Sequence, residues 1–474
     1  MHLNALKYTA WSNFKSILTG IIDSVAPRKK VRIKQRTEQW MTSSILDKIR
    51  LRDNISHLIK KDNHDVSFSH FASLRNSIQK EIKKAKINYF KNKLDENMGE
   101  PRILWKYLKN LGYSAKSNSK AKIVLNIDGS LQPDTLSVCK HINTFFTSVA
   151  NVLTNKLPLV SNEYGVGSDT FERFYPSKGV ESINFELKHV DNDFIFGELS
   201  KLNIHKAVGL DDIAPRFLRD GATHLSPIIA HIVNLSIGSS TVPHDLKLAK
   251  VIPLFKKNSR LEVGNYRPVS LLSTISKILE KSIYVQLDHY LSTNKLLYEF
   301  QSGFRPGFST ETCLIFLTDY IRSQLDEGKY VGMLLLDVQK AFDSVNHEIL
   351  CHKLEAMGIK SAWFKSYLSN RRQLVQVDGI QSDLMQLSCG VPQGSLLGPL
   401  LYLIYSNDMV TSVKNLLLLY ADDSVIISAD KNPDVVARDL GLDLDSCNTW
   451  LINNKLSLHV DKTELILFGS RIHP

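Results

Sequence analysis

Apolar residues follow two different periods along this chain of 474 residues. Between Phe68 and Leu94 they recur every three or four positions, which predicts a helix with one apolar stripe. That stripe consists of Phe71, Leu74, Ile78, Ile82, Ala85 and Tyr89. From Gly179 onward the chain changes to short apolar runs that alternate with helical spacing, so we expect strands and helices in alternation there.

Two of the apolar runs lie next to acidic residues. Residues 331–336 form a run of strand length that is followed directly by Asp337. Residues 416–419 and 425–427 flank Asp422 and Asp423, which predicts a hairpin with both acids in its turn. Strands often end in an aspartate, and an Asp-Asp turn also serves turn geometry alone, so each pattern by itself has an ordinary structural explanation.

The composition, with 43% apolar and 23% charged residues, indicates a globular protein with room for two or three domains. The net charge of +11 comes from residues 1–120, where Lys and Arg far outnumber Asp and Glu. This asymmetry indicates a polyanionic partner, nucleic acid before membrane, although a solvated basic helix is the alternative. The basic cluster at residues 27–32 is a candidate nuclear import signal. Residues 114–122 and 158–179 have the composition of linkers.

The chain has five cysteines and no C-x-x-C pair, which argues against a zinc module and against a disulfide framework. A reducing compartment fits this cysteine usage best. The N-terminus has no signal-peptide pattern, and no run approaches the roughly 20 apolar residues of a spanning helix. We therefore expect a soluble protein of the nucleus or the cytoplasm, with no membrane partner.

Asp337, Asp422 and Asp423 together form a candidate metal site. Adjacent carboxylates between buried strands repel one another unless a cation offsets their charge. Hard oxygen ligands of this kind suit Mg²⁺. Two such ions roughly 4 Å apart stabilise both the attacking and the leaving oxygens of a phosphoryl transfer. The three acids thus predict the chemistry of polymerases and of some nucleases.

A third pattern is the turn predicted for residues 390–395, which contains two glycines and a proline. The apolar run that follows predicts a helix. Backbone approaches a nucleotide closely at such glycines, although a plain strand-to-helix turn would have the same composition.

With these patterns in this order, the chain resembles reverse transcriptases, and closely the jockey-like group of non-LTR retrotransposons. Blocks similar to the polymerase fingers of that family occupy residues 206–212, 251–257, 265–272 and 301–306. Blocks similar to its palm occupy residues 336–345, 390–395, 420–423 and 454–464. The similarity covers roughly residues 195–470, and residues 1–120 resemble, more loosely, the family's segment between endonuclease and polymerase.

The resemblance implies an α+β fold, a right-hand polymerase with an antiparallel palm sheet flanked by helices. It implies a basic helical extension over residues 1–120, a connecting region over 121–194, fingers over 195–330 and a palm over 331–474. The implied partners are an RNA template, a DNA primer and deoxynucleoside triphosphates.

The resemblance also implies roles for single residues. Asp337, Asp422 and Asp423 would hold two Mg²⁺ ions, or Mn²⁺ in their place, with Val338 adding its carbonyl oxygen. Lys462 would protonate the pyrophosphate leaving group.

The other implied roles concern the nucleotide. The ring of Phe342 would exclude a 2′-hydroxyl, with core packing as its alternative role. Gln393 would touch the nucleotide or the template. Basic side chains from the fingers would reach the triphosphate or support that region, each with surface charge as the alternative; they are Arg267, Lys256 or Lys257, and Arg305. Asp343 is expected to be structural, and Asp211 and Asp212 to form a turn that starts a helix.

Three parts of the family's protein find no match in this sequence: the endonuclease, the primer grip with the thumb, and a ribonuclease H region. We therefore expect this chain to polymerise poorly or not at all. The competing hypotheses are an RNA-dependent RNA polymerase, a group II intron or retron type of reverse transcriptase, and a non-catalytic nucleic-acid-binding remnant that uses the basic N-terminal quarter.

Overall fold

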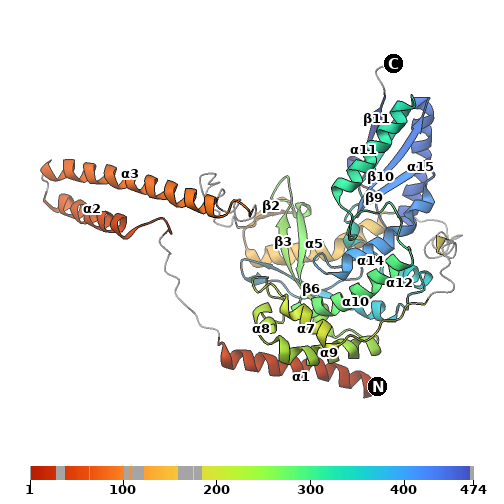
Figure 1. Cartoon of the computed structure of the whole chain (residues 1–474), viewed down its shortest axis with the longest axis horizontal. Helices are drawn as coiled ribbons and strands as arrows, with labels where there is room; N and C mark the ends of the chain where they lie inside the picture. Colours follow the sequence, from red (N-terminus) through yellow and green to blue (C-terminus); the bar gives the residue numbers. More distant parts are fainter. Residues whose placement is uncertain are drawn as a thin grey trace. The chain divides into compact units, whose positions relative to one another are not determined.

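The computed structural model describes residues 2–27, 38–62, 65–100, 107, 122–158, 174–175 and 184–469. The chain forms two compact units, one of residues 1–26 and 122–474 and the other of residues 27–121. Figure 1 shows the elements of both units. The candidate nuclear import signal and the two predicted linkers lie almost entirely outside the described residues.

The smaller unit is a pair of helices, α2 (Ser43–Asp62) and α3 (Asp65–Glu96). Ile45, Ile78 and Phe90 are buried in it, and the helices are joined by an ion pair between Lys48 and Glu81. The helix predicted between Phe68 and Leu94 is confirmed as part of α3. Its predicted stripe is buried or half-buried, whereas several of its basic residues are exposed: Arg75, Lys80, Lys83, Lys84 and Lys91.

The larger unit mixes helices and sheets, as expected for its class. Its helices are α1 (His2–Val25), α5 (Thr135–Asn155), α7 (Asn192–Ser200), α8 (Pro215–Asp220), α9 (Ala222–Gly238), α10 (Thr274–Thr293), α11 (Thr310–Asp326), α12 (His347–Ala356), α13 (Ala362–Leu368), α14 (Leu397–Ser406) and α15 (Pro433–Asn453). Its strands are β1 (Leu125–Ile127), β2 (Ser130–Gln132), β3 (Leu248–Phe255), β4 (Tyr266–Leu271), β5 (Tyr330–Leu336), β6 (Arg372–Val377), β7 (Ile380–Gln381), β8 (Met385–Gln386), β9 (Leu416–Tyr420), β10 (Asp423–Asp430) and β11 (Glu464–Phe468). Short 3₁₀ turns lie at His244–Lys247, Val263–Asn265, Ala341–Asp343, Asn407–Ser412 and Val460–Lys462.

The N-terminal helix α1 belongs to this larger unit. Its Trp11, Phe14 and Leu18 are buried in the same core as α9, and Lys15 Nζ lies 2.7 Å from Asp245 Oδ2. Residues 1–120 were expected to form a single extension. They are instead divided between the two units, because the apolar face of α1 finds its partner in the main core.

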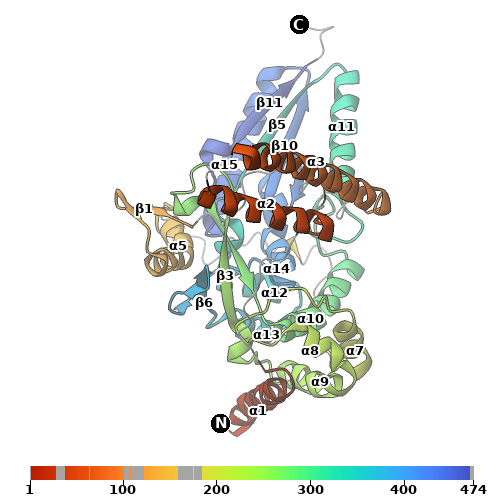
Figure 2. The same ribbon diagram turned by 90° about the vertical axis from the view of Figure 1, so that its left-hand side faces the viewer.

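An antiparallel sheet of four strands, in the order β11-β5-β10-β9, forms one end of the larger unit. The two predicted strands at residues 331–336 and 416–419 are confirmed as β5 and β9, and the hairpin between β9 and β10 is confirmed as well. Figure 2 shows α11 and α15 on opposite sides of this sheet.

Both faces of β5, β9 and β10 are largely buried, which explains why these strands read as continuous apolar runs, whereas the edge strand β11 is exposed. In β5, Val331 and Met333 face one core, and Leu334 and Leu336 face the other. Gly332 lies under α15, where a Cβ atom would come within 2.5 Å of Val436 Cγ1. The absence of a side chain at Gly332 therefore allows α15 to pack closely on the sheet.

A second sheet has the strand order β4-β3-β6-β7, with β8 also paired to β6. Strand β3 runs antiparallel to β4 and parallel to β6. Helix α5 covers this sheet: Ile142 and Phe146 share a core with Val251 and Val375. The helix begins at Asp134, whose carboxylate accepts a hydrogen bond from the backbone N–H of Ser137.

The five cysteines are free thiols. Within the described ranges of the chain, the helices are too short or too polar to cross a membrane.

Candidate active site

The predicted acidic residues meet at one end of the four-stranded sheet. Asp337 follows the last residue of β5, Asp422 lies in the turn between β9 and β10, and Asp423 is the first residue of β10. Ser424 pairs with Leu336 across β5 and β10, so the three carboxylates come to the same sheet edge. The pairing of two strands that are far apart in sequence thus assembles the acidic cluster.

Like charges lie close together in this cluster. Burial raises the pKa of Asp422, and the neighbouring Asp423 and Asp337 raise it further. The Lys462 ammonium lies beside Asp337, with 2.6 Å between Nζ and Oδ2. Three His, Cys, Asp or Glu side chains are nowhere close enough together, within the described ranges, to hold a metal ion as they stand. The chemistry of the donor set nevertheless fits a hard divalent cation, because carboxylate oxygens are hard ligands and the Lys462 ammonium already compensates the charge of Asp337.

An open pocket of about 570 Å³ adjoins the acids. It brings together most of the residues predicted to bind metal or nucleotide: Lys256, Lys257, Arg267, Asp337, Val338, Phe342, Gln393, Asp422 and Lys462. Asp423 and Arg305 are not part of its lining. Blocks predicted from separate parts of the sequence therefore surround a single space.

The basic wall of the pocket comes from the second sheet. Phe255 pairs with Tyr266 across β3 and β4, which brings Lys256 next to Arg267. Burial lowers the pKa of Lys256, and the neighbouring cations Arg267 and Lys462 lower it further. A bound polyanion such as a triphosphate would offset the repulsion between these cations.

Phe342 forms part of the pocket lining and is half-buried. Its ring stacks on the buried Tyr402 of α14 with 4.7 Å between ring centroids. Phe342 therefore packs against Tyr402 with one face of its ring and still lines the pocket. Core packing and exclusion of a 2′-hydroxyl are compatible in this geometry.

Gln393 is held by Asp343, a residue that was expected to be merely structural. Gln393 Nε2 donates to Asp343 Oδ1 at 2.8 Å, and the backbone N–H of Val391 donates to the Phe342 carbonyl at 2.8 Å. Burial raises the pKa of Asp343 to about 6, against the opposing effects of Gln393 and Lys340. Asp343 also lines the pocket, so its position next to Phe342 in the sequence was a usable signal.

Gln301 holds the Asp-Asp turn at residues 422–423 from a different part of the chain, and this contact was not predicted. Its Oε1 accepts hydrogen bonds from Gly303 N at 2.8 Å and from Ala421 N at 3.0 Å. Ala421 has a φ of 60°, a conformation that a non-glycine residue keeps only when its surroundings hold it. Residues 301–306 stood out in the sequence as a block, but nothing in the block indicated that its glutamine contacts the Asp-Asp turn.

Arg305 points back into its own loop. Its Nη1 donates to the carbonyl oxygens of Tyr298 at 2.9 Å and of Gln301 at 3.0 Å. It therefore braces the segment that carries Gln301, at a distance from the pocket lining.

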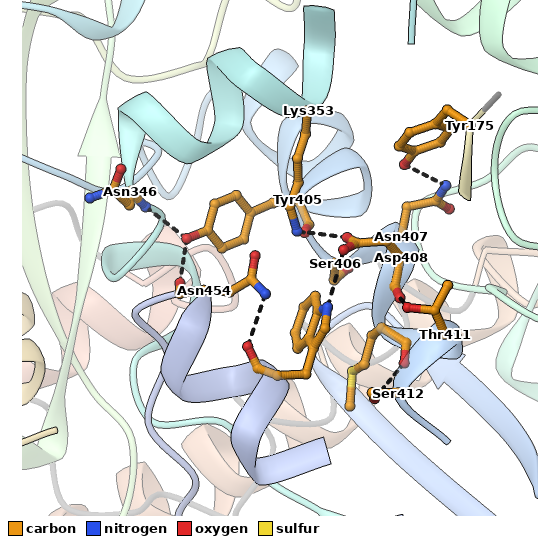
Figure 3. Close-up of polar contacts among 12 residues, drawn as sticks. Tyr175, Asn346, Lys353, Tyr405, Ser406, Asn407, Asp408, Thr411, Ser412 and Asn454 are labelled. Carbon is orange, nitrogen blue, oxygen red and sulfur yellow. Dashed lines mark hydrogen bonds and ion pairs between the residues drawn. The ribbon is translucent and has the colours of Figure 1, made fainter. Parts of the chain in front are cut away.

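A buried polar network lies beneath the sheet edge (Figure 3). Lys353 Nζ donates to Asp408 Oδ1 at 2.6 Å, and Trp450 Nε1 donates to Asp408 Oδ2 at 3.1 Å. The hydroxyl of Tyr405 donates to the carbonyl of Asn454 and accepts from Asn346 N at 3.3 Å. The network thus ties α12, α14 and α15 together under the segments that carry the candidate site.

Comparison with known proteins agrees with this geometry. Residues 255–471 match the family model described as reverse transcriptase (RNA-dependent DNA polymerase). The chain is 27% identical to the RNA-directed DNA polymerase from mobile element jockey of Drosophila melanogaster, over 98% of this chain and 51% of that protein. It is 30% identical to the probable RNA-directed DNA polymerase from transposon BS of the same species, over 59% of this chain and 32% of that protein.

A third relative is the probable RNA-directed DNA polymerase from transposon X-element of D. melanogaster, at 33% identity over 46% of this chain and 25% of that protein. The chain therefore spans about half the length of the jockey protein, and less of the other two. The matched region includes the three acids Asp337, Asp422 and Asp423, the basic residues Lys256 and Arg267, and the turn that carries Gln393. Residues 255–471 therefore carry a reverse transcriptase domain, and the chain is similar to RNA-directed DNA polymerases from mobile elements.

Proposed function

We propose that this chain joins deoxynucleotides to the 3′-hydroxyl of a DNA primer on an RNA template. In this proposal residues 195–330 act as polymerase fingers and residues 331–474 as the palm. The observation that carries it is the shared pocket: Asp337 and Asp422 face the same space as Lys256, Arg267 and Lys462. Nucleotidyl transfer requires carboxylates that hold metal cations next to basic side chains that bind phosphates.

Asp337, Asp422 and Asp423 would hold two Mg²⁺ ions, or Mn²⁺ in their place, together with the Val338 carbonyl. When bound, such ions lower the pKa of the primer hydroxyl and neutralise charge on the triphosphate. Burial and the neighbouring acids Asp423 and Asp337 raise the pKa of Asp422, and a bound cation would offset the cost of charging this carboxylate.

Arg267 and Lys256 or Lys257 would bind the triphosphate, which is the anion best matched to their mutual repulsion. Lys462 would hold a proton at Nζ for the departing pyrophosphate. Its ammonium now pairs with Asp337, and a cation at Asp337 would release it toward the phosphates.

Phe342 would exclude a 2′-hydroxyl, supported by the stacked ring of Tyr402. Gln393 would touch the nucleotide or the template, with its amide oriented by the bond to Asp343. Arg305 would support the segment that holds the Asp-Asp turn.

The test is primer extension on an RNA template with Mg²⁺ and deoxynucleotides. The sequence predicts weak extension at most, and any extension by the chain should fall by at least about a thousandfold in the Asp422→Asn, Asp423→Asn double variant, because the metal ligands act as one unit. Asp445→Asn, which alters an exposed acid on α15, is the matched control and should extend normally. Equal extension by the chain and the double variant would contradict the proposed site.

Competition with ribonucleotides separates the proposal from an RNA-dependent RNA polymerase. Preference for deoxynucleotides that weakens in Phe342→Ala supports reverse transcription, whereas preferential use of ribonucleotides by the unmodified chain would overturn it.

A further inference from the structure

Phe304 occupies a position that the proposed chemistry leaves unexplained. Its side chain is 51% exposed, although burying an aromatic ring is normally favourable. Its backbone has a φ of 55°, in the left-handed region that bulky residues avoid. A large apolar side chain that is both exposed and strained indicates a constraint other than folding.

The turn that carries Phe304 is pressed against the Asp-Asp turn. A Cβ atom on Gly303 would lie 2.2 Å from Ala421 N, so only glycine allows this approach. Ser302 N donates to the Leu419 carbonyl at 2.8 Å, which fastens the same segment to β9. Phe304 is therefore held at a fixed place immediately beside the Asp-Asp turn.

The ring of Phe304 continues an aromatic row that begins inside the pocket. It meets Phe342 edge to face, with 6.0 Å between centroids and 88° between planes. Phe342 in turn stacks on Tyr402. Phe342 lines the nucleotide pocket and Phe304 does not, so Phe304 lies next to a lining residue but outside the lining itself.

We propose that Phe304 is a binding residue for the primer–template duplex, and that its ring packs against the terminal base pair. This inference rests on the function proposed above, because the carboxylates fix where the primer 3′-hydroxyl must be. The base pair at that hydroxyl must then lie against the surface beside the Asp-Asp turn and outside the nucleotide pocket. Packing a base or sugar against an exposed ring does not depend on sequence, as a polymerase requires.

The probe is a fluorescent DNA primer annealed to an RNA template, and the readout is its dissociation constant from the full chain. Phe304→Asn should weaken binding about tenfold, the usual scale for loss of one aromatic contact to a base. Phe304→Tyr should bind as the unmodified chain does, because it keeps the ring. Phe196→Ala, which removes an exposed phenylalanine from α7, is the matched control and should leave binding unchanged.

Thermal stability separates binding from folding. Asparagine tolerates the left-handed region better than phenylalanine, so Phe304→Asn should melt at the same temperature as the unmodified chain or slightly above it. KM for deoxynucleotides should stay within about twofold, because Phe304 does not line the pocket. Weaker duplex binding with unchanged or higher stability supports the proposal.

Two results would overturn it in distinguishable ways. Equal duplex affinity of Phe304→Asn and the unmodified chain would remove Phe304 from the binding surface and leave the proposed function intact. If the unmodified chain itself bound no primer–template duplex, the proposed function would fail together with this inference.

Discussion

Two lysine–aspartate pairs in this protein have the same length and opposite surroundings. Lys353 and Asp408 approach to 2.6 Å with both side chains fully buried. Lys462 and Asp337 also approach to 2.6 Å, with side chains 40% and 32% exposed. The two ion pairs therefore have the same N–O distance but are different kinds of interaction.

The buried pair is surrounded by further partners. Lys353 also donates to the Tyr405 carbonyl at 2.6 Å and lies over the Tyr405 and Trp450 rings, and Trp450 Nε1 satisfies the second oxygen of Asp408. Such a pair is costly to break, because removal of one member leaves the other charged in an apolar core. Burial lowers the pKa of Lys353, and Asp408 opposes that shift.

The exposed pair lines the open pocket. Water screens it, so it contributes little to stability, and the other groups around Asp337 include the acid Asp422 rather than a satisfied network. The comparison teaches that burial, more than distance, separates an ion pair that holds the fold from one that can yield its place to a cation.

The largest effect is expected from breaking the buried pair. Lys353→Met should cost about 3–5 kcal/mol of unfolding free energy, because Asp408 loses its counter-charge. Chemical denaturation measures this loss. The double variant Lys353→Met, Asp408→Leu should recover most of it, and a double variant as unstable as the single one would contradict the explanation.

Breaking the exposed pair should affect catalysis and leave stability alone. Lys462→Met should lower kcat about a hundredfold, the low end for losing a general acid, while the unfolding free energy changes by less than about 0.5 kcal/mol. Single-turnover extension and denaturation on the same preparation measure both quantities. Lys455→Met offers a matched control at an exposed lysine in the same region. A stability loss as large as that of Lys353→Met would refute the distinction between the two pairs.

The half-buried acid Asp343 extends the comparison to pH. Its pKa is raised to about 6 by burial, so its contribution to stability is present at low pH and is lost as the pH rises through about 6. Asp343→Asn removes this dependence. The variant should therefore gain about 1–2 kcal/mol relative to the unmodified chain between pH 5 and pH 8. Melting curves at the two pH values measure the gain, and Asp445→Asn should show none.

The smallest effect concerns the crowded acids themselves. The pKa of Asp422 is raised, so its charged form destabilises the metal-free fold at neutral pH. Asp422→Asn should raise the metal-free stability at pH 7.5 and reduce the stabilisation that Mg²⁺ gives. Thermal melts with and without Mg²⁺ measure both. Equal Mg²⁺ responses of the variant and the unmodified chain would count against a cation at Asp422.

The sequence by itself determined the elements and the residues that carry charge. Continuous apolar runs predicted β5, β9 and β10, and the three-and-four spacing predicted α3, because these patterns are local consequences of which faces are buried. The three acids were found from their positions beside apolar runs. Arg267, Lys256 and Gln393 were found from the resemblance of their sequence blocks to a known family.

Only the tertiary structure decided what each of these residues touches. The structure divides residues 1–120 between two units. It also forms hydrogen bonds between segments far apart in the chain, from Ala421 to Gln301 and from Gln393 to Asp343. No local period encodes such contacts, because they arise when sheets and helices pack. The same holds for Lys353 and Asp408, which are 55 residues apart in the sequence and form a fully buried ion pair. Lys462 and Asp337 form an ion pair that stays partly exposed.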